Sequence, residues 1–243
     1  MLLDRARTAA KRVPVIVTGV DTAAHLARMV RSCWFDDVRA EMEAAYAEHR
    51  WDFGGPRELE RHRRLLDLVA HYAGELGTLA VLEVGCAEGV FTERLAAACR
   101  SVMAIDVAQA ACRRARERLA SSPNVAVLQL DVSRTVPPAS FDVVFLMDTL
   151  ECIPRPADVR KALLHVLAAL RPGGLLAVSD CKLPPSMEGS WWARLLAQGG
   201  DGMVRTVSRH RSLRLLAQED DLAASGCELG YVDHVLAVWQ KQS

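Results

Sequence analysis

The sequence of 243 residues has no excess of charge of either sign, no paired cysteine motif and no long apolar run. Its 30 basic and 30 acidic residues balance, so bulk electrostatics favours neither nucleic acid nor an anionic membrane as a partner. The seven cysteines are scattered without a CxxC pair, which argues against a disulfide framework and a structural zinc site. No apolar run approaches membrane-spanning length, and the VPVIV stretch is too short for the core of a signal peptide. We therefore expect a soluble, cytoplasmic protein with no membrane partner.

Apolar residues make up 51% of the chain, which suffices for a sizeable core, and the length favours one domain with an appendage. Over residues 20–50 they recur at helical spacing without a strong breaker. WDFGGP at 51–56 is a turn signal, and the helical period then resumes as far as Gly77. We expect a helical extension over residues 1–56, followed by one domain over residues 57–243.

The pattern changes at residue 79, where short β-branched and aliphatic runs begin to alternate with helical segments. Such alternation indicates βαβ units around a parallel sheet, and so an α/β fold. We expect strands at 79–84, 101–106, 125–131, 141–148 and 174–180, with helices at 89–99, 108–121 and 156–170 between them.

After the last of these strands the sequence becomes irregular, with Trp191 and Trp192 side by side. We expect residues 183–215 to form a cap or a substrate-facing insertion. The two tryptophans either form an apolar wall for a sugar or aromatic ligand or anchor the cap to the core. A short helix should end near Gly226, and ELGYVDHVLAVWQK (228–241) should close the chain as two strands.

The stretch VLEVGCAEGVFTERLA, residues 81–96, combines a strand, a turn of small residues and the start of a helix. Small residues at such a turn let backbone amides approach a ligand beyond the carboxyl end of the strand. Their spacing is G-x-A-x-G instead of the dinucleotide pattern G-x-G-x-x-G. Glu83 and Glu88 would repel a pyrophosphate, whereas Asp106, about twenty residues on, could accept both hydroxyls of a ribose. The combination predicts a positively charged adenosine derivative as the ligand.

In chain order, VLEVGCAEG, AIDV, LDV, FDVVFLMDTLEC and LRPGGLLAVSD resemble the motifs of class I S-adenosylmethionine-dependent methyltransferases. More narrowly, WDFGGPRELERHRRLL and GCAEGVFTERLA are similar to the nodulation protein S group, which N-methylates a chito-oligosaccharide. The resemblance implies a Rossmann-like, doubly wound sheet of seven strands in the order 3-2-1-4-5-7-6, with the last strand antiparallel. It also implies S-adenosyl-L-methionine as the cofactor. The extension before residue 57 would then be a lid over the cofactor, a dimer surface or a packed helix.

The resemblance further implies which residues bind the cofactor. The turn after residue 84 would hold its methionine part, Asp106 its ribose, and Arg61 its carboxylate. The full set implied in this way is Arg61, Glu83, Gly85, Cys86, Ala87, Gly89, Asp106, Val107, Asp131, Val132 and Met147. Ala87 stands where glycine is more usual, and its methyl group is tolerable there if the residue keeps a negative φ.

Methyl transfer asks little covalent work of the protein, because the sulfonium is already an activated donor. Positioning the acceptor and excluding water supply most of the rate, although a hydroxyl acceptor benefits from a base. The candidates for such a base are Asp148, His210, His234 and Glu151. His165 is expected to pack in its helix, and Cys152, where many relatives have His, is not expected to be catalytic.

Asp148 and Asp180 end neighbouring strands of the expected sheet. In metal-dependent O-methyltransferases, carboxylates at these places hold a magnesium ion together with both acceptor oxygens. The alternative is that either acid caps a loop or faces the cofactor.

The favoured function is methyl transfer to nitrogen or oxygen of a small-molecule acceptor, a saccharide or a specialised metabolite. No basic stripe with interleaved aromatic residues is visible, so RNA or protein is a less favoured substrate and no nucleic acid partner is expected. A cofactor-binding protein without catalysis is the third alternative, and the sequence leaves a homodimer open.

Overall fold

The computed structural model describes residues 38–47, 53–138, 140–153, 155–182, 200–220 and 234–242. The chain divides into two compact units, Met1–Val38 and Arg39–Ser243. Except for Val38, everything described below belongs to the second unit. The extension before residue 38 and the pair Trp191 and Trp192 lie outside the described residues, so the expectations for them stay predictions.

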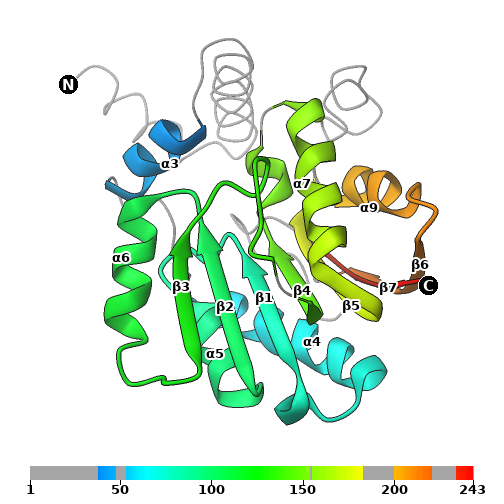
Figure 1. The fold of residues 1–243 in the computed structure, drawn as a ribbon, viewed down its shortest axis with the longest axis horizontal. Helices are drawn as coiled ribbons and strands as arrows, with labels where there is room; N and C mark the ends of the chain where they lie inside the picture. Colours follow the sequence, from blue (N-terminus) through cyan, green and yellow to red (C-terminus); the bar gives the residue numbers. More distant parts are fainter. Residues whose placement is uncertain are drawn as a thin grey trace, which may run out of the picture. The chain divides into compact units, whose positions relative to one another are not determined.

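Seven strands form one sheet in the order β3-β2-β1-β4-β5-β7-β6, which confirms the predicted topology (Figure 1). Only β7 runs antiparallel to its neighbours. The strands are β1 (Ala80–Val84), β2 (Ser101–Asp106), β3 (Val125–Gln129), β4 (Phe141–Met147), β5 (Leu170–Cys181), β6 (Leu213–Asp220) and β7 (His234–Lys241).

The helices follow the sequence signals closely. Pro56 and Pro156 each occupy the first turn of a helix, where a fixed φ and a missing N–H do no harm. The helices are α3 (Val38–Ala47), α4 (Pro56–Ala73), α5 (Val90–Ala98), α6 (Gln109–Arg118), α7 (Pro156–Ala169) and α9 (Gly200–Ser208), with 3₁₀ turns η1 (Leu76–Thr78) and η2 (Leu150–Cys152).

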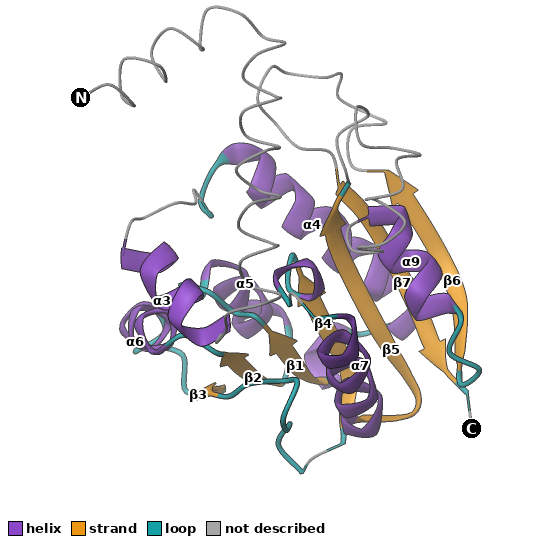
Figure 2. Cartoon of the chain, turned by 90° about the horizontal axis from the view of Figure 1, so that it is seen from above, coloured by secondary structure: helices purple, strands orange, loops and turns teal. Residues whose placement is uncertain are grey.

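Helices cover both faces of the sheet, as in a doubly wound fold. The face that carries Val81 and Phe145 packs against α4 and α5, and the opposite face, with Leu82 and Leu146, packs against α7 and α9. Figure 2 shows α4 and α5 on one side of β1 and β4, with α7 on the other. Because both faces are covered, the central strands are near-continuous apolar runs.

The last part of the chain departs from the sequence prediction. The closing segment 228–241 was expected to hold two strands, but β6 lies earlier, at Leu213–Asp220, and the described part of that segment forms β7. β6 is an edge strand whose residues are mostly exposed, so it lacks the apolar run that marks a buried strand.

The prediction of a cap or a substrate-facing insertion at 183–215 stays a prediction. Residues 183–199 are not described, but α9 packs three side chains, Met203, Val204 and Val207, into the main core. This helix, with the start of β6, is part of the domain core. Among the described residues, no helix combines the length and the apolarity that crossing a membrane requires.

Candidate active site

The turn after β1 has a left-handed backbone at three alternate residues. Gly85, Ala87 and Gly89 have φ values of 79°, 48° and 80°. A side chain on Gly85 would place its Cβ 2.4 Å from the hydroxyl of Thr149, so this position needs glycine for space as well as for conformation. Thr149 itself bonds to the carbonyl of Val84 at 2.7 Å, which ties the turn to the end of β4.

Ala87 does not keep the negative φ that the sequence analysis required of it. Among the described residues, Ala87 and Asp148 are the two non-glycine residues with positive φ, 48° and 47°. Left-handed backbone costs a residue with a Cβ about 1 kcal/mol, and such strain gathers at functional sites. Both strained residues lie at carboxyl ends of neighbouring strands, one after β1 and one after β4.

Asp106 ends β2 beside this turn and is 6% exposed. One carboxylate oxygen accepts the amide of Ala87 at 3.0 Å, and the other accepts the amide of Ala108 at 2.8 Å. Burial raises the pKa of Asp106 to about 6, although these amides oppose the rise. The amide of Ala87 thus joins the turn and the acid into one cradle.

The sequence analysis assumed two free negative charges at Glu83 and Glu88, but the structure does not show them. Glu83 is buried, accepts the hydroxyl of Thr92 at 2.6 Å, and has a pKa raised by burial to about 8. It therefore holds a proton at neutral pH. Glu88 forms an ion pair with Arg114 of α6. The preference for a cation at this turn consequently rests on Asp106 more than on these two acids.

Two residues of α3 that the sequence analysis did not select reach the same edge of the sheet. Both carboxylate oxygens of Glu43 accept amides at the start of α6, from Gln109 and Ala110, as a capping carboxylate does. Tyr46 packs on Ala108 beside Ala87, and burial and the nearby Asp106 raise its pKa. The apolar spacing of the helix was visible in the sequence, but its docking place was not.

The remaining predicted cofactor residues lie around the turn and the ends of β3 and β4. Cys86 and Val132 are buried, whereas Val107 and Met147 are half-buried. Asp131 accepts the amide and hydroxyl of Ser133 and pairs with Arg134. The structure brings this set to one edge of the sheet and leaves its roles as a prediction.

Arg61 lies in α4 and is 3% exposed. Its guanidinium donates to Ser179 at 2.6 Å, to Asp148 at 2.7 Å and to Glu58. Burial raises the pKa of Asp148, but Arg61 and the hydrogen bond from His234 outweigh burial and hold it below its ordinary value. Arg61 therefore keeps Asp148 ionised, and binding a cofactor carboxylate would require it to exchange one of these partners.

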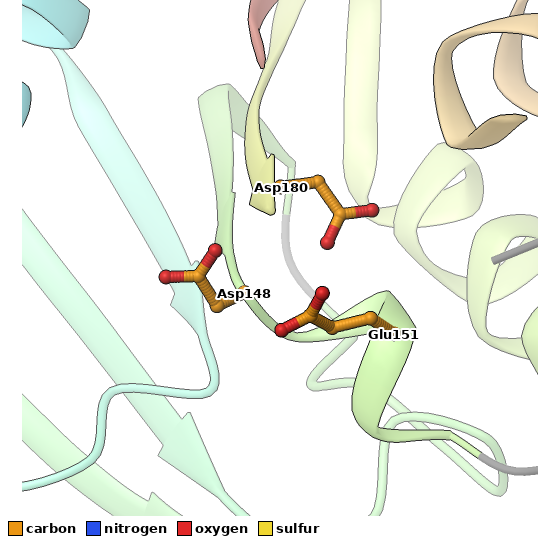
Figure 3. A group of neighbouring side chains, drawn as sticks. All are labelled: Asp148, Glu151 and Asp180. Carbon is orange, nitrogen blue, oxygen red and sulfur yellow. The ribbon is translucent and has the colours of Figure 1, made fainter. Parts of the chain in front are cut away.

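Glu151, in η2, and Asp180, near the end of β5, complete a group of three carboxylates with Asp148. One oxygen of each lies within 4.8 Å of the others, and Figure 3 shows the carboxyl group of Glu151 between those of Asp148 and Asp180. Burial and the charge of Asp148 raise the pKa of Glu151 to about 7. Burial, Glu151 and Asp148 raise that of Asp180 well above its usual range.

The two candidate histidines lie at opposite ends of the strands. His234 begins β7, pairs in register with Cys181, and places Nε2 3.4 Å from Asp148 Oδ1. His210 precedes β6, whose first residue is in register with Lys241 at the other end of β7. The eight residues of β6 span about 25 Å, which separates the two ends of the strands. The structure therefore does not bring His210 together with Asp148 and His234, and His210 bonds instead to Ser212.

The other sequence expectations for side chains hold in part. His165 packs in α7 and bonds to the carbonyl of Val132 at 2.8 Å, as expected of a structural residue. The thiol of Cys152 donates to the carbonyl of Asp148, and burial raises its pKa well above the usual thiol range. A protonated thiol with a backbone partner is suited to structure, not to catalysis.

Comparison with known proteins agrees with this geometry. Residues 81–174 match a family described as a methyltransferase domain. Nodulation protein S of Rhizobium tropici is 33% identical over 129 residues, 53% of each chain. A ubiquinone biosynthesis O-methyltransferase of Xanthomonas campestris pv. campestris is 33% identical over 178 residues, 68% of this chain and 72% of that protein.

The chain belongs to the class I S-adenosylmethionine-dependent methyltransferases. Among solved structures, N-methyltransferase NodS from Bradyrhizobium japonicum WM9, in complex with S-adenosyl-L-homocysteine, has a TM-score of 0.70 at 23% identity. That comparison covers 86% of this chain and 100% of NodS, and it supports the methyltransferase fold. The chain spans about half the length of the nodulation proteins that it matches.

The carboxylate group of this methyltransferase does not fit a magnesium ion well. The spacing of Asp148, Glu151 and Asp180 would suit a divalent cation with oxygen ligands at about 2.1 Å. However, Asp148 already binds the guanidinium of Arg61 at 2.7 Å, and this positive charge opposes a dication beside it. Glu151 and Asp180 then remain, and they could hold Mg²⁺ only beside this positive charge, with water or the acceptor supplying its other ligands.

Proposed function

We propose that this chain transfers a methyl group from S-adenosylmethionine to nitrogen or oxygen of a small-molecule acceptor, a saccharide or a specialised metabolite. The observation that carries the proposal is the 3.0 Å contact between the amide of Ala87 and Asp106. It joins a turn stripped of bulky side chains to an acid at the end of the neighbouring strand, the arrangement that receives a nucleoside.

The donor would lie across the carboxyl ends of β1 and β2. In this proposal the turn from Gly85 to Gly89 receives its methionine part, Asp106 its ribose hydroxyls, and Asp131 with Val132 its adenine. When bound, S-adenosylmethionine supplies a methyl group activated by a sulfonium. Tyr46 and Ala108 provide an apolar boundary at this edge, which keeps water from the bound donor.

The acceptor would lie beside the end of β4, at Met147 and Asp148. β1 and β4 are neighbours in the sheet, so their carboxyl ends are about 5 Å apart. Holding an acceptor atom there, in line with the donor methyl group, supplies much of the rate because it converts a bimolecular encounter into a positioned reaction. Asp148 and His234 are the side chains at this place that can accept a proton from a hydroxyl acceptor.

The matched proteins support the acceptor classes without selecting one. The resemblance to the nodulation protein S group implies a saccharide, and the ubiquinone biosynthesis O-methyltransferase is named for the biosynthesis of a small molecule. The solved relative NodS is an N-methyltransferase. Nitrogen and oxygen acceptors therefore both belong to the proposal.

Calorimetry with S-adenosylmethionine and S-adenosylhomocysteine tests the shared premise. We expect one site per chain in the full-length protein. Asp106→Asn should bind about 100-fold more weakly, because it loses the two charge-assisted hydrogen bonds to the ribose hydroxyls, worth about 1.5 kcal/mol each. Glu117→Gln, an exposed change on α6, should bind as the parent does.

Absence of binding by the parent protein would remove the proposal. If binding is present, conversion of the donor to S-adenosylhomocysteine with pooled saccharides and metabolites should follow. Persistent absence of turnover would instead favour a binding protein without catalysis.

A further inference from the structure

Glu151 and Asp180 form a carboxyl pair that the mechanism above does not use. Asp180 is 1% exposed, and neither of its oxygens accepts a hydrogen bond from any donor among the described residues. Its carboxyl neighbour is Glu151, whose group points toward it (Figure 3). Two carboxylates can bond to each other only if one carries a proton, so the pair without a ligand must share one.

The third acid of the group has its own positive partner. Asp148 binds Arg61 at 2.7 Å and lies 3.4 Å from His234, which balances its charge. Glu151 accepts the thiol of Cys181, and no ion pair to either Glu151 or Asp180 is present among the described residues. A buried carboxylate without a donor or a counter-ion is costly. The pair therefore calls for one positive charge that carries N–H groups.

This pair lies within reach of the proposed methyl donor. Met147 and Ser179 are in register on β4 and β5, and the amide of Asp148 donates to the carbonyl of Ser179 at 2.8 Å. β5 is two strands from β1, so the pair is about 10 Å from the turn after β1. That separation suits an acceptor whose reacting nitrogen lies between the acids and the donor.

We propose that Glu151 and Asp180 bind the protonated amino group of the methyl acceptor, and that Glu151 takes the proton that frees its lone pair. The inference rests on the proposed function and narrows it to amine acceptors. A hydroxyl acceptor would bring no charge to the pair, and a dication would have to bind beside the positive charge of Arg61.

The reaction then balances as follows. The ammonium gives one proton to the carboxylate of Glu151, which leaves a neutral amine with its lone pair. The lone pair forms the new N–C bond as the C–S bond of the donor breaks, and the electron pair of that bond remains on sulfur as a thioether. The methylated nitrogen is positively charged and loses its extra proton after transfer.

Several groups face Glu151 and set where it titrates. Burial and then the charge of Asp148 raise its pKa, while hydrogen bonds with Cys181 and Asp180 and the charge of His234 lower it. Arg61, from α4, acts on Asp180 and Asp148. The balance leaves the pKa of Glu151 at about 7, where a carboxylate can both take and release a proton near neutrality.

Carbon-13 NMR of the full-length protein, labelled at glutamate carboxyl carbons and saturated with S-adenosylhomocysteine, tests the binding step with methylammonium chloride as the probe. We expect a signal that titrates near pH 7, disappears in Glu151→Gln, and moves at least one pH unit lower when methylammonium replaces sodium. Asp180→Asn should abolish the response to methylammonium, and Glu117→Gln should keep it. A midpoint that methylammonium does not move would overturn the inference.

Turnover with matched pools of amines and of the corresponding alcohols tests the chemical step. We expect methyl transfer to the amine pool, a loss of at least 100-fold in Glu151→Gln at pH 7, and recovery toward the parent rate at pH 9 to 10, where the free amine is already neutral. Transfer to alcohols alone, or activity that EDTA abolishes and magnesium restores, would overturn the inference and leave the proposed function standing. Failure to bind S-adenosylhomocysteine would instead overturn the proposed function.

Discussion

The acids at the carboxyl ends of β1 and β2 differ in their partners from the acids at the carboxyl ends of β4 and β5. At the β1–β2 end each acid has a fixed protein partner: Thr92 for Glu83, two backbone amides for Asp106, and Arg114 for Glu88. At the β4–β5 end, Asp148 is the one of its three acids with a cationic partner among the described residues, Arg61, while Glu151 and Asp180 face each other.

This difference teaches which end is preorganised and which end adapts. Fixed donors hold the carboxylates of the β1–β2 end in one orientation, so a ligand meets a formed cradle. In our proposal the acid pair of the β4–β5 end changes its protonation with the ligand instead, because its charge has no cationic partner in the described part of the chain. A methyltransferase needs the same donor every time, whereas its acceptor is the variable partner.

The largest effect is expected from removing Arg61, the buried cation that pairs with Asp148 at the β4–β5 end. Arg61→Met should lower the free energy of unfolding by about 3 kcal/mol, because it leaves Asp148 and Glu58 without their buried partner. Thermal unfolding should show a Tm lower by roughly 6 to 12 °C.

Arg63→Met is the matched control for this change. Arg63 is in the same helix and pairs with Glu60 and Asp67, but its side chain is 56% exposed. Exposed pairs contribute little, so we expect a change within about 0.5 kcal/mol. Equal effects of the two variants would show that water, not Arg61, balances the charge of Asp148. The contrast drawn between the two ends of the site would then be wrong.

A smaller effect, with a defined pH dependence, is expected from Glu83 at the β1–β2 end. Its folded pKa of about 8 lies above its ordinary value of 4.5. Between these values the folded state holds a proton that the unfolded state has lost, so stability falls as pH rises, by at most about 1.4 kcal/mol per pH unit. Glu83→Gln should remove this slope and exceed the parent stability at pH 8 by more than about 1 kcal/mol.

Urea unfolding at pH 5, 6.5 and 8 measures this slope, with Glu117→Gln as the exposed control. Both the parent and the control should lose stability over this range. If Glu83→Gln follows a curve parallel to the parent, Glu83 is ionised in the folded protein, and its bond with Thr92 does not neutralise this end.

The smallest effect concerns the strained turn. Ala87→Gly relieves a φ of 48°, worth about 1 kcal/mol, but glycine adds about 0.5 kcal/mol of conformational entropy to the unfolded chain. We expect a net stabilisation of about 0.5 kcal/mol, a rise in Tm of roughly 1 to 2 °C. Ala97→Gly, an exposed change within α5, should destabilise by about 1 kcal/mol. A loss of stability in both variants would mean that the turn is not strained.

The fold and the β1–β2 end were largely predictable because their signals are local. The turn and the strand-end acid Asp106 lie within 25 residues of one another. The alternation of strands and helices indicated a parallel sheet, and the family resemblance implied the order of its strands. β6 was misplaced because an exposed edge strand carries no continuous apolar run. The condition set for Ala87, a negative φ, is also not met, since backbone conformation at a tight turn depends on what surrounds it.

Sequence alone determined which residue types stand at the ends of the central strands, because strand periodicity and turn chemistry act over a few residues. Tertiary structure decided which of them meet. Arg61, Asp148 and His234 are far apart in the chain, and they come together because parallel strands share an edge while β7 returns antiparallel to it. His210 precedes β6, which begins beside the far end of β7, so it lies at the opposite ends of the strands. The sheet register thus distinguishes two histidines that the sequence did not separate. Whether a carboxylate keeps its charge was likewise decided by its neighbours in space, since burial and nearby charges set its pKa.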